Sequence, residues 1–355
     1  MNADKSSLER LGMVGVSRRK CLSILLGALS CVFVSETRAA DRGLAGFAKA
    51  LAWVVKHSAS PDDGGLLSQV EELIAFYSIS NFVGSAGTIG WLDVQLLNRI
   101  QAINTKCALD YSTGAHVRNP LDPATYLIAA RISERYGVPA WGPRRIIESW
   151  LNSEGSLTRM TARYAVWSMC YLARLGYLSP STVFHWLLAR RAFEAKASVT
   201  GTSCCSCGMP NGEHYQVRRA LYDSTHEILA LCDFGWKAES FLLPVDIPTY
   251  RKDVTLGLEW ARTANELDVM AELLVCARIL DLGTSFQARN AVEHLLYSQL
   301  EDGSWNFPIE GRMDPQRHVV LTSMAALAAQ TPGVATLFRT DRFTRRPFHG
   351  PVAAQ

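Results

Sequence analysis

The chain has 355 residues, enough for one large domain, and 48% of them are apolar, so it can bury a sizeable core. Charged residues make up only 19% of the chain. This low charge and the high apolar content together argue against a disordered protein. The net charge is +3 and the Lys and Arg residues are scattered along the chain. Neither nucleic acid nor an acidic membrane surface is therefore expected as a partner.

The first 40 residues have the pattern of a targeting segment. Arg18 and Arg19 precede an apolar run over residues 21–34, which is shorter than the roughly 20 residues that span a bilayer. Small residues at Ala39 and Ala40 offer a cleavage point. The segment resembles a bacterial twin-arginine export signal, which implies a periplasmic or extracellular protein with no transmembrane span after signal removal. The alternative is a misassigned start, or a helix that packs on the domain of a cytoplasmic protein.

Beyond the signal, apolar residues recur with helical spacing, and Gly and Pro fall mainly between the periodic segments. Twelve helices are expected, which pair into six hairpins within a domain at 41–338. Residues 339–355 are expected to be an extended or disordered tail. The expected helices are 44–56, 66–80, 91–104, 122–136, 143–152, 160–176, 180–196, 215–233, 249–263, 267–281, 285–300 and 314–330.

One short motif indicates how these helices assemble. An apolar helix leads to Gln299, and Asp302, Gly303, Ser304 and Trp305 follow it. This pattern resembles the QW repeat of α/α-toroid proteins, which include terpene cyclases and protein prenyltransferases. The resemblance implies an all-α fold of the (α/α)6 type, with about twelve helices in six hairpins. It implies a structural role for the motif and no particular reaction.

A second segment, Thr225 to Gly235, resembles uncharacterised bacterial helical proteins. No activity follows from that resemblance.

In such a toroid, the second and more apolar helix of each hairpin is expected to face inward, so that the six inner N-terminal ends share one mouth. Polar residues are concentrated at those ends, which favours an acid and base site there. The alternative is that helix N-termini carry acidic residues simply as caps. The polar residues concerned are Glu71, Glu72, Tyr126, Arg159, Arg163, Tyr164, Asp223, His226, Glu227, Asp268, Glu272, Arg317 and His318.

From this set we expect an enzyme whose substrate is a small molecule or a saccharide. Glycoside hydrolysis needs two carboxylates about 5 to 10 Å apart, and a lyase needs an imidazole or phenol as base. The expected catalytic residues are Glu72, His226, Asp268, Glu272 and His318, and the expected substrate-binding residues are Tyr126, Arg163, Tyr164 and Trp305. A helical protein that binds a partner without catalysis is the alternative, because the acidic motifs of terpene cyclases and the common nucleotide and hydrolase motifs are absent.

Cysteines cluster in one loop. Cys204 and Cys207 have the spacing at which two thiolates reach one ion, and His214 follows them, so zinc is a candidate cofactor there. A disulfide after export, or a loop with neither, are the alternatives. The remaining cysteines of the domain, Cys107, Cys170, Cys232 and Cys276, are expected in the core.

Overall fold

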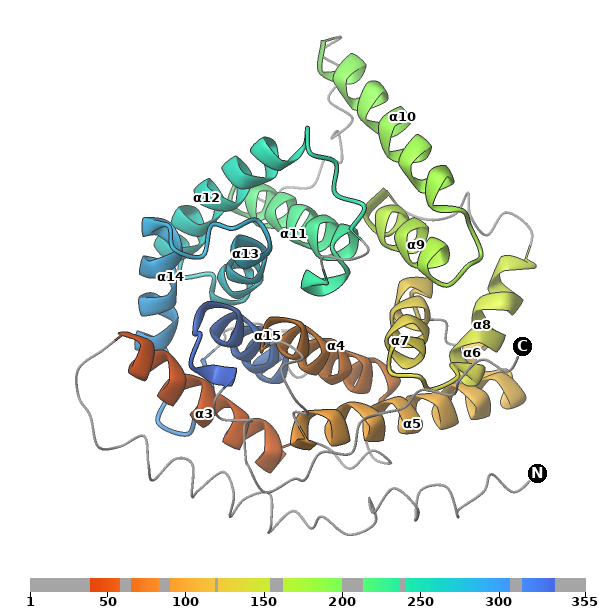
Figure 1. The fold of residues 1–355 in the computed structure, drawn as a ribbon, viewed down its shortest axis with the longest axis horizontal. Helices are drawn as coiled ribbons and strands as arrows, with labels where there is room; N and C mark the ends of the chain where they lie inside the picture. The colour runs from red at the N-terminus through yellow and green to blue at the C-terminus, as the bar shows by residue number, and fades with distance from the viewer. Residues whose placement is uncertain are drawn as a thin grey trace, which may run out of the picture.

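A computed structural model describes residues 39–57, 65–83, 90–118, 121–153, 162–199, 213–236, 240–306 and 315–335. Over these residues the chain is all α-helical, with thirteen α-helices, one short 3-10 helix and no strand (Figure 1). The helices are α3 (Ala39–His57), α4 (Leu66–Val83), α5 (Gly90–Thr113), α6 (Ala115–Arg118), α7 (Pro123–Arg135), α8 (Trp141–Leu151), α9 (Ala162–Arg174), α10 (Pro180–Val199), α11 (Glu213–Leu231), η1 (Asp233–Gly235), α12 (Ile247–Ala264), α13 (Leu267–Ile279), α14 (Phe286–Tyr297) and α15 (Pro315–Gln330).

All twelve expected helices are present, because their starts and stops carry clear local signals. Asp122 accepts a hydrogen bond from the Ala124 amide at 2.8 Å, and Pro123 occupies the first helical position of α7. Ser285 caps α14 in the same way. The sequence did not predict α6, which is only four residues long and follows Gly114 with φ at +70°. It did not predict η1 either.

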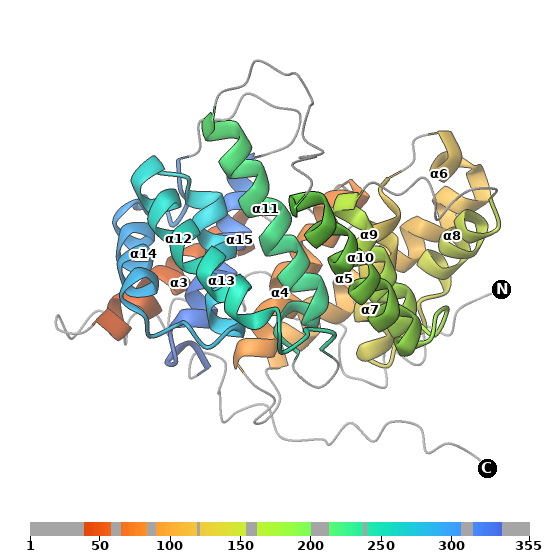
Figure 2. The same cartoon turned by 90° about the horizontal axis from the view of Figure 1, so that it is seen from above.

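Six helices surround the centre of the molecule in Figure 1: α4, α7, α9, α11, α13 and α15. Each of them packs against the next in this order, and α15 packs against α4. They are the second members of the expected pairs, and they are the more buried members where the two can be compared: nearly all of α13 is buried, whereas α12 buries one face. The side view in Figure 2 shows α10 and α11 crossing the thickness of the molecule.

The Gln–Trp motif fastens the end of α14 to α3. Gln299 donates through its side-chain amide to the carbonyl of Gly46 at 2.9 Å and to that of Gly303 at 3.0 Å. Trp305 is fully buried and donates its indole N–H to the Leu295 carbonyl at 2.7 Å. Gly303 has φ at +93°, and a Cβ there would overlap the backbone of α3. The motif therefore has the structural role that the sequence implied.

The expected signal and tail mostly lie outside the described residues, although α3 begins at Ala39, within the expected signal segment. In the part of the chain that is described, no helix has the length and apolar character needed to cross a bilayer.

Candidate functional site

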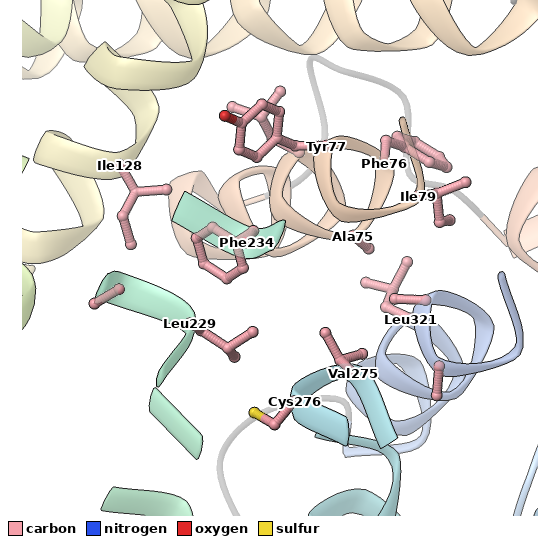
Figure 3. Packing of buried hydrophobic residues seen from close by; sticks show 14 of the residues in the cluster. Ala75, Phe76, Tyr77, Ile79, Ile128, Leu229, Phe234, Val275, Cys276 and Leu321 are labelled. Carbon is pink, nitrogen blue, oxygen red and sulfur yellow. The ribbon is translucent and has the colours of Figure 1, made fainter. Parts of the chain in front are cut away.

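A cavity of about 120 Å³ lies between the central helices. Residues of α4, α9, α11 with the following η1, α13 and α15 line it, so five segments distant in sequence meet around one space. Most of its wall is apolar. The apolar side chains include Ile74, Ala75, Leu229, Phe234, Val275 and Leu321, and Figure 3 shows five of them, all but Ile74, pointing toward one another.

Four ionisable side chains also line this cavity: Glu71, His226, Glu272 and His318. Glu71, Glu272 and His318 lie within the first two turns of α4, α13 and α15. The apolar residues follow one or two turns later on the same helices. The cavity consequently has a polar end, which we call the mouth, and an apolar interior. Three of the four, His226, Glu272 and His318, are residues for which the sequence predicted a catalytic role.

His226 and Glu272 face each other across α11 and α13, with Nε2 of the imidazole 3.3 Å from the carboxylate, and they form an ion pair whenever the imidazole is protonated. Thr225 donates its hydroxyl to the same carboxylate. Burial opposes ionisation of Glu272, but the charge and hydrogen bond of His226 and the hydrogen bond of Thr225 outweigh it and hold its pKa below the usual value. Glu272 is therefore a buried, ionised carboxylate that fixes the orientation of a partly exposed imidazole.

Aromatic rings fix the other sides of the His226 imidazole. Trp167 contacts it edge to face at 5.3 Å, and Tyr222 lies 5.9 Å away. These contacts leave the imidazole on the cavity wall, with 22% of its side-chain surface exposed.

His318 lies between two carboxylates. Its Nδ1 is 3.5 Å from Glu71 and its Nε2 is 3.4 Å from Asp268. Burial lowers the pKa of this imidazole, but Asp268 and Glu71 outweigh burial and raise the pKa to about 10. At neutral pH His318 is thus a cation and cannot serve as a general base.

Asp268 is held by further donors. Tyr222 donates its phenol to one carboxylate oxygen, and Thr322 donates to the other at 3.1 Å. Burial and the charge of Asp268 raise the pKa of Tyr222, so the phenol stays protonated. Asp268 is 4% exposed and acts as the acceptor at the centre of this network.

Glu72 does not line the cavity. Its carboxylate is fully buried between the guanidinium groups of Arg99 and Arg317, where it forms ion pairs with both. Glu71, one residue earlier and so about 100° around α4, is the residue that reaches the mouth. The sequence placed both residues at the helix start but could not fix the rotation of the helix. Glu72 therefore occupies a packing position.

The four expected substrate-binding residues lie elsewhere or are not described. Tyr126 is buried away from the cavity, and burial raises its pKa to about 12. Trp305 has no exposed surface and uses its N–H within the α14 clamp, so its position fits packing rather than substrate contact. The side chains of Arg163 and Tyr164 lie outside the described residues.

Sequence reasoning missed Trp167, Phe234 and Thr322 as lining residues. Trp167 lies one turn after Arg163 on α9, and Thr322 one turn after His318 on α15, so helical spacing from the expected mouth residues could have found both. Phe234 lies in a turn that no periodic pattern marks.

The predicted zinc ligands Cys204 and Cys207 lie outside the described residues, so that site stays a prediction. His214 is exposed at the start of α11, 3.7 Å from the carboxylate of Glu266 and packed on the ring of Trp260. Among the residues that the structure describes, no three His, Cys, Asp or Glu side chains are close enough to share a metal ion.

Four cysteines are buried in the core, as expected: Cys107, Cys170 and Cys276 within helices, and Cys232 just past the end of α11.

These features define a class of protein: an all-helical domain with an apolar central cavity and a mouth of paired imidazoles and carboxylates. Residues 126–329, more than half of the chain, match the family described as "Domain of unknown function (DUF6895)", and the chain belongs to that family. The matched range begins within α7 and ends one residue before the end of α15, and it does not include α4, which supplies Glu71 and Ala75 to the cavity. No curated protein and no solved structure matches the chain.

Proposed function

We propose that this protein is an enzyme that holds a small molecule in the central cavity, with its apolar part inside and its polar end at the mouth. His226 transfers a proton at that polar end, and Glu272 orients the imidazole. The observation that carries the proposal is the position of His226 on the wall of an apolar cavity, 3.3 Å from a buried carboxylate.

The proton transfer follows from the chemistry of the pair. If the Nε2–H group of a neutral imidazole donates to ionised Glu272, Nδ1 is left as the atom that takes a proton. Glu272 then stabilises the imidazolium that forms, as the carboxylate does in other carboxylate–imidazole pairs. The apolar surroundings strengthen this electrostatic effect, because they exclude water from the reacting groups.

Proton transfer by His226 has more support than hydrolysis of a saccharide by two carboxylates. Such hydrolysis needs one carboxylic acid with a raised pKa. Here the pKa of Glu272 is lowered, Glu72 is buried between two arginines, and Asp268 accepts from a phenol and a hydroxyl. Glu272 is thus held in its ionised form, and the carboxylates of Glu72 and Asp268 are already occupied by donors from the protein.

We further propose that the helices form the (α/α)6 toroid implied by the Gln–Trp motif. The cyclic order of contacts among α4, α7, α9, α11, α13 and α15 supports this arrangement. Export by a twin-arginine signal is part of the same proposal and rests on residues 1–40 of the sequence.

A non-catalytic binding protein is the second candidate. One observation favours it: the charged groups at the mouth are already paired within the protein, His318 with Glu71 and Asp268, and Glu272 with His226. Such pairing is what a site built for rigidity would show. The two candidates differ in whether His226 moves a proton.

A base-catalysed elimination separates them. With nitrobenzisoxazole as probe, a base takes the proton from the ring carbon beside nitrogen, the N–O bond breaks and a coloured cyano-nitrophenolate forms. We expect the protein to accelerate this reaction, His226→Asn to lose about 100-fold or more of that rate, and Glu272→Gln about tenfold or more.

The matched control is His185→Asn, which alters an exposed imidazole on α10, outside the cavity lining, and should leave the rate unchanged. Circular dichroism checks that each variant is folded. A His226→Asn rate equal to that of the unmodified protein would contradict the enzyme and leave the binding protein as the working proposal.

A further inference from the structure

We infer that Phe234 sets the length of ligand that the cavity accepts, and that the buried carboxylate of Asp233 positions it. This inference rests on the proposed function, because it concerns the same cavity. It predicts a ligand whose apolar part is short, of the size of a small ring or a chain of a few carbons.

The depth of the cavity follows from the helices that line it. On α4 the lining residues run from Glu71 to Ser78, and on α15 from His318 to Ala325, which is about 10 Å along either helix axis. Phe234 follows the C-terminal end of α11, beyond Leu229. Its ring therefore closes the end of the cavity opposite the mouth, and we call it the floor.

Neighbouring aromatic rings hold the floor in place. Trp167 contacts the Phe234 ring edge to face at 5.7 Å, and Tyr77 does so at 6.3 Å. In Figure 3 the Phe234 ring lies between Ile128, Leu229 and Ala75. Phe234 is 2% exposed, so the ring has little room to move aside for a longer ligand.

The backbone that carries this ring is strained. Asp233 has φ at +46° and Phe234 has φ at +53°, both in the left-handed region, which Asp tolerates but a bulky residue such as Phe rarely adopts. Strain of this kind persists only where the surroundings impose it, and it is concentrated at functional sites. The surroundings of Asp233 are well suited to impose it.

Asp233 is fully buried and makes three contacts through one carboxylate oxygen. Tyr77 of α4 donates to it at 3.1 Å, Arg131 of α7 donates at 3.2 Å, and Arg135 of α7 lies 3.9 Å away. Arg135 also stacks on the ring of Trp236, just past η1. Two central helices thereby fix the start of the turn.

The carbonyl groups of the turn are fixed as well. Asn81 of α4 donates its amide to the carbonyls of Phe234 at 3.2 Å and Asp233 at 3.4 Å. Gly235 lies against Phe82, where a Cβ would be only 2.8 Å from the ring. The turn is consequently held on both sides, and its backbone fixes the direction in which the Phe234 ring points.

Straight-chain primary alcohols from butanol to decanol test the inference, with the hydroxyl expected at the mouth. Each buried methylene should raise affinity about fourfold until the chain meets the floor. By titration calorimetry we expect the rise to stop at a short chain in the unmodified protein. In Phe234→Ala it should continue for several more carbons.

A second variant, Phe234→Gly, removes the ring and also relieves the left-handed strain, so a stable cavity without its floor is available if Phe234→Ala does not fold. Phe241→Ala is the matched control. It removes another buried aromatic ring, which packs on Phe184 and does not line the cavity, and it should leave the length limit unchanged.

The role of Asp233 has its own readout. Asp233→Asn keeps a residue that tolerates the left-handed region but removes the charge that faces Arg131 and Arg135. We expect this variant to accept longer alcohols than the unmodified protein does. The affinity for these longer alcohols, relative to that for butanol, should be at least tenfold higher than in the unmodified protein. A variant that is less stable but has the same limit would show that Asp233 is only structural.

The outcomes separate the inference from the proposed function. If the unmodified protein binds the short alcohols and Phe234→Ala and Phe234→Gly stop at the same chain length, Phe234 is not the floor and only the inference fails. If no alcohol shows saturable binding to any of the proteins, the cavity does not hold a ligand, and the proposed function fails with the inference.

Discussion

The two carboxylates beside His318, from Glu71 and Asp268, decide the charge of this residue. Burial alone would favour a neutral imidazole, yet the paired charges raise its pKa to about 10 from an ordinary value of 6.5. His318 is thus a fixed cation at the mouth, while His226, which pairs with Glu272, is the imidazole that we propose for proton transfer. The surroundings of the two histidines that line the cavity therefore differ.

The raised pKa of His318 makes a prediction for stability. Because the folded-state pKa lies above the unfolded value, protonation favours the folded state. This contribution is complete below about pH 6.5 and is lost as the pH rises through about 10. We expect His318→Gln to have a lower urea midpoint of unfolding than the unmodified protein at pH 6. The difference between the two midpoints should shrink as the pH approaches 10.

Urea denaturation of both proteins across that pH window measures the gap directly, and the difference between them removes the effects of other titrating groups. The effect is reduced by solvent screening, since 37% of the His318 side chain is exposed. A gap that stays constant or widens with rising pH would contradict the assignment of His318 as a cation.

At the scale of elements, α14 and the turn after it act as one unit with α3. The indole of Trp305 reaches back to the Leu295 carbonyl, and Gln299 bonds to a carbonyl of α3. The turn between them needs a glycine at position 303, where α3 leaves no room for a side chain. The unit joins the last helix pair of the domain to the first.

Trp305→Phe tests this unit. It keeps an aromatic ring but removes the N–H group, so the Leu295 carbonyl loses its side-chain donor. We expect a loss of about 1–3 kcal/mol in the free energy of unfolding. Trp141→Phe, at a position that is 45% exposed, is the matched control and should change stability by less than about 0.5 kcal/mol. Equal losses in the two variants would mean that the bond contributes nothing specific.

For the whole molecule, helical periodicity with Pro, Ser and Asp at the helix starts was sufficient to predict an all-α domain and the twelve longer helices that the structure describes. The same pattern predicted that His226, Glu272 and His318 lie near one another, and all three line one cavity. It could not fix rotation about a helix axis, which is why Glu71 rather than Glu72 reaches the mouth. A rotation of about 100° between consecutive residues decides this, and only packing sets it.

The floor of the cavity could not be predicted for a different reason. Phe234 adopts left-handed backbone that its own side chain disfavours, because Tyr77, Arg131 and Asn81 from distant helices hold the turn. Such a turn depends on contacts across more than 100 residues of sequence. Local propensity carries no signal for it.

The central claim is that His226 lies on the wall of a cavity that a small molecule fills. The most direct measurement is a titration of the protein with hexanol, followed by NMR through the histidine ring signals and assigned with His226→Asn and His318→Gln. We expect saturable shifts of the His226 and His318 signals and none for exposed His214. Saturable shifts that leave His226 unmoved would contradict this claim.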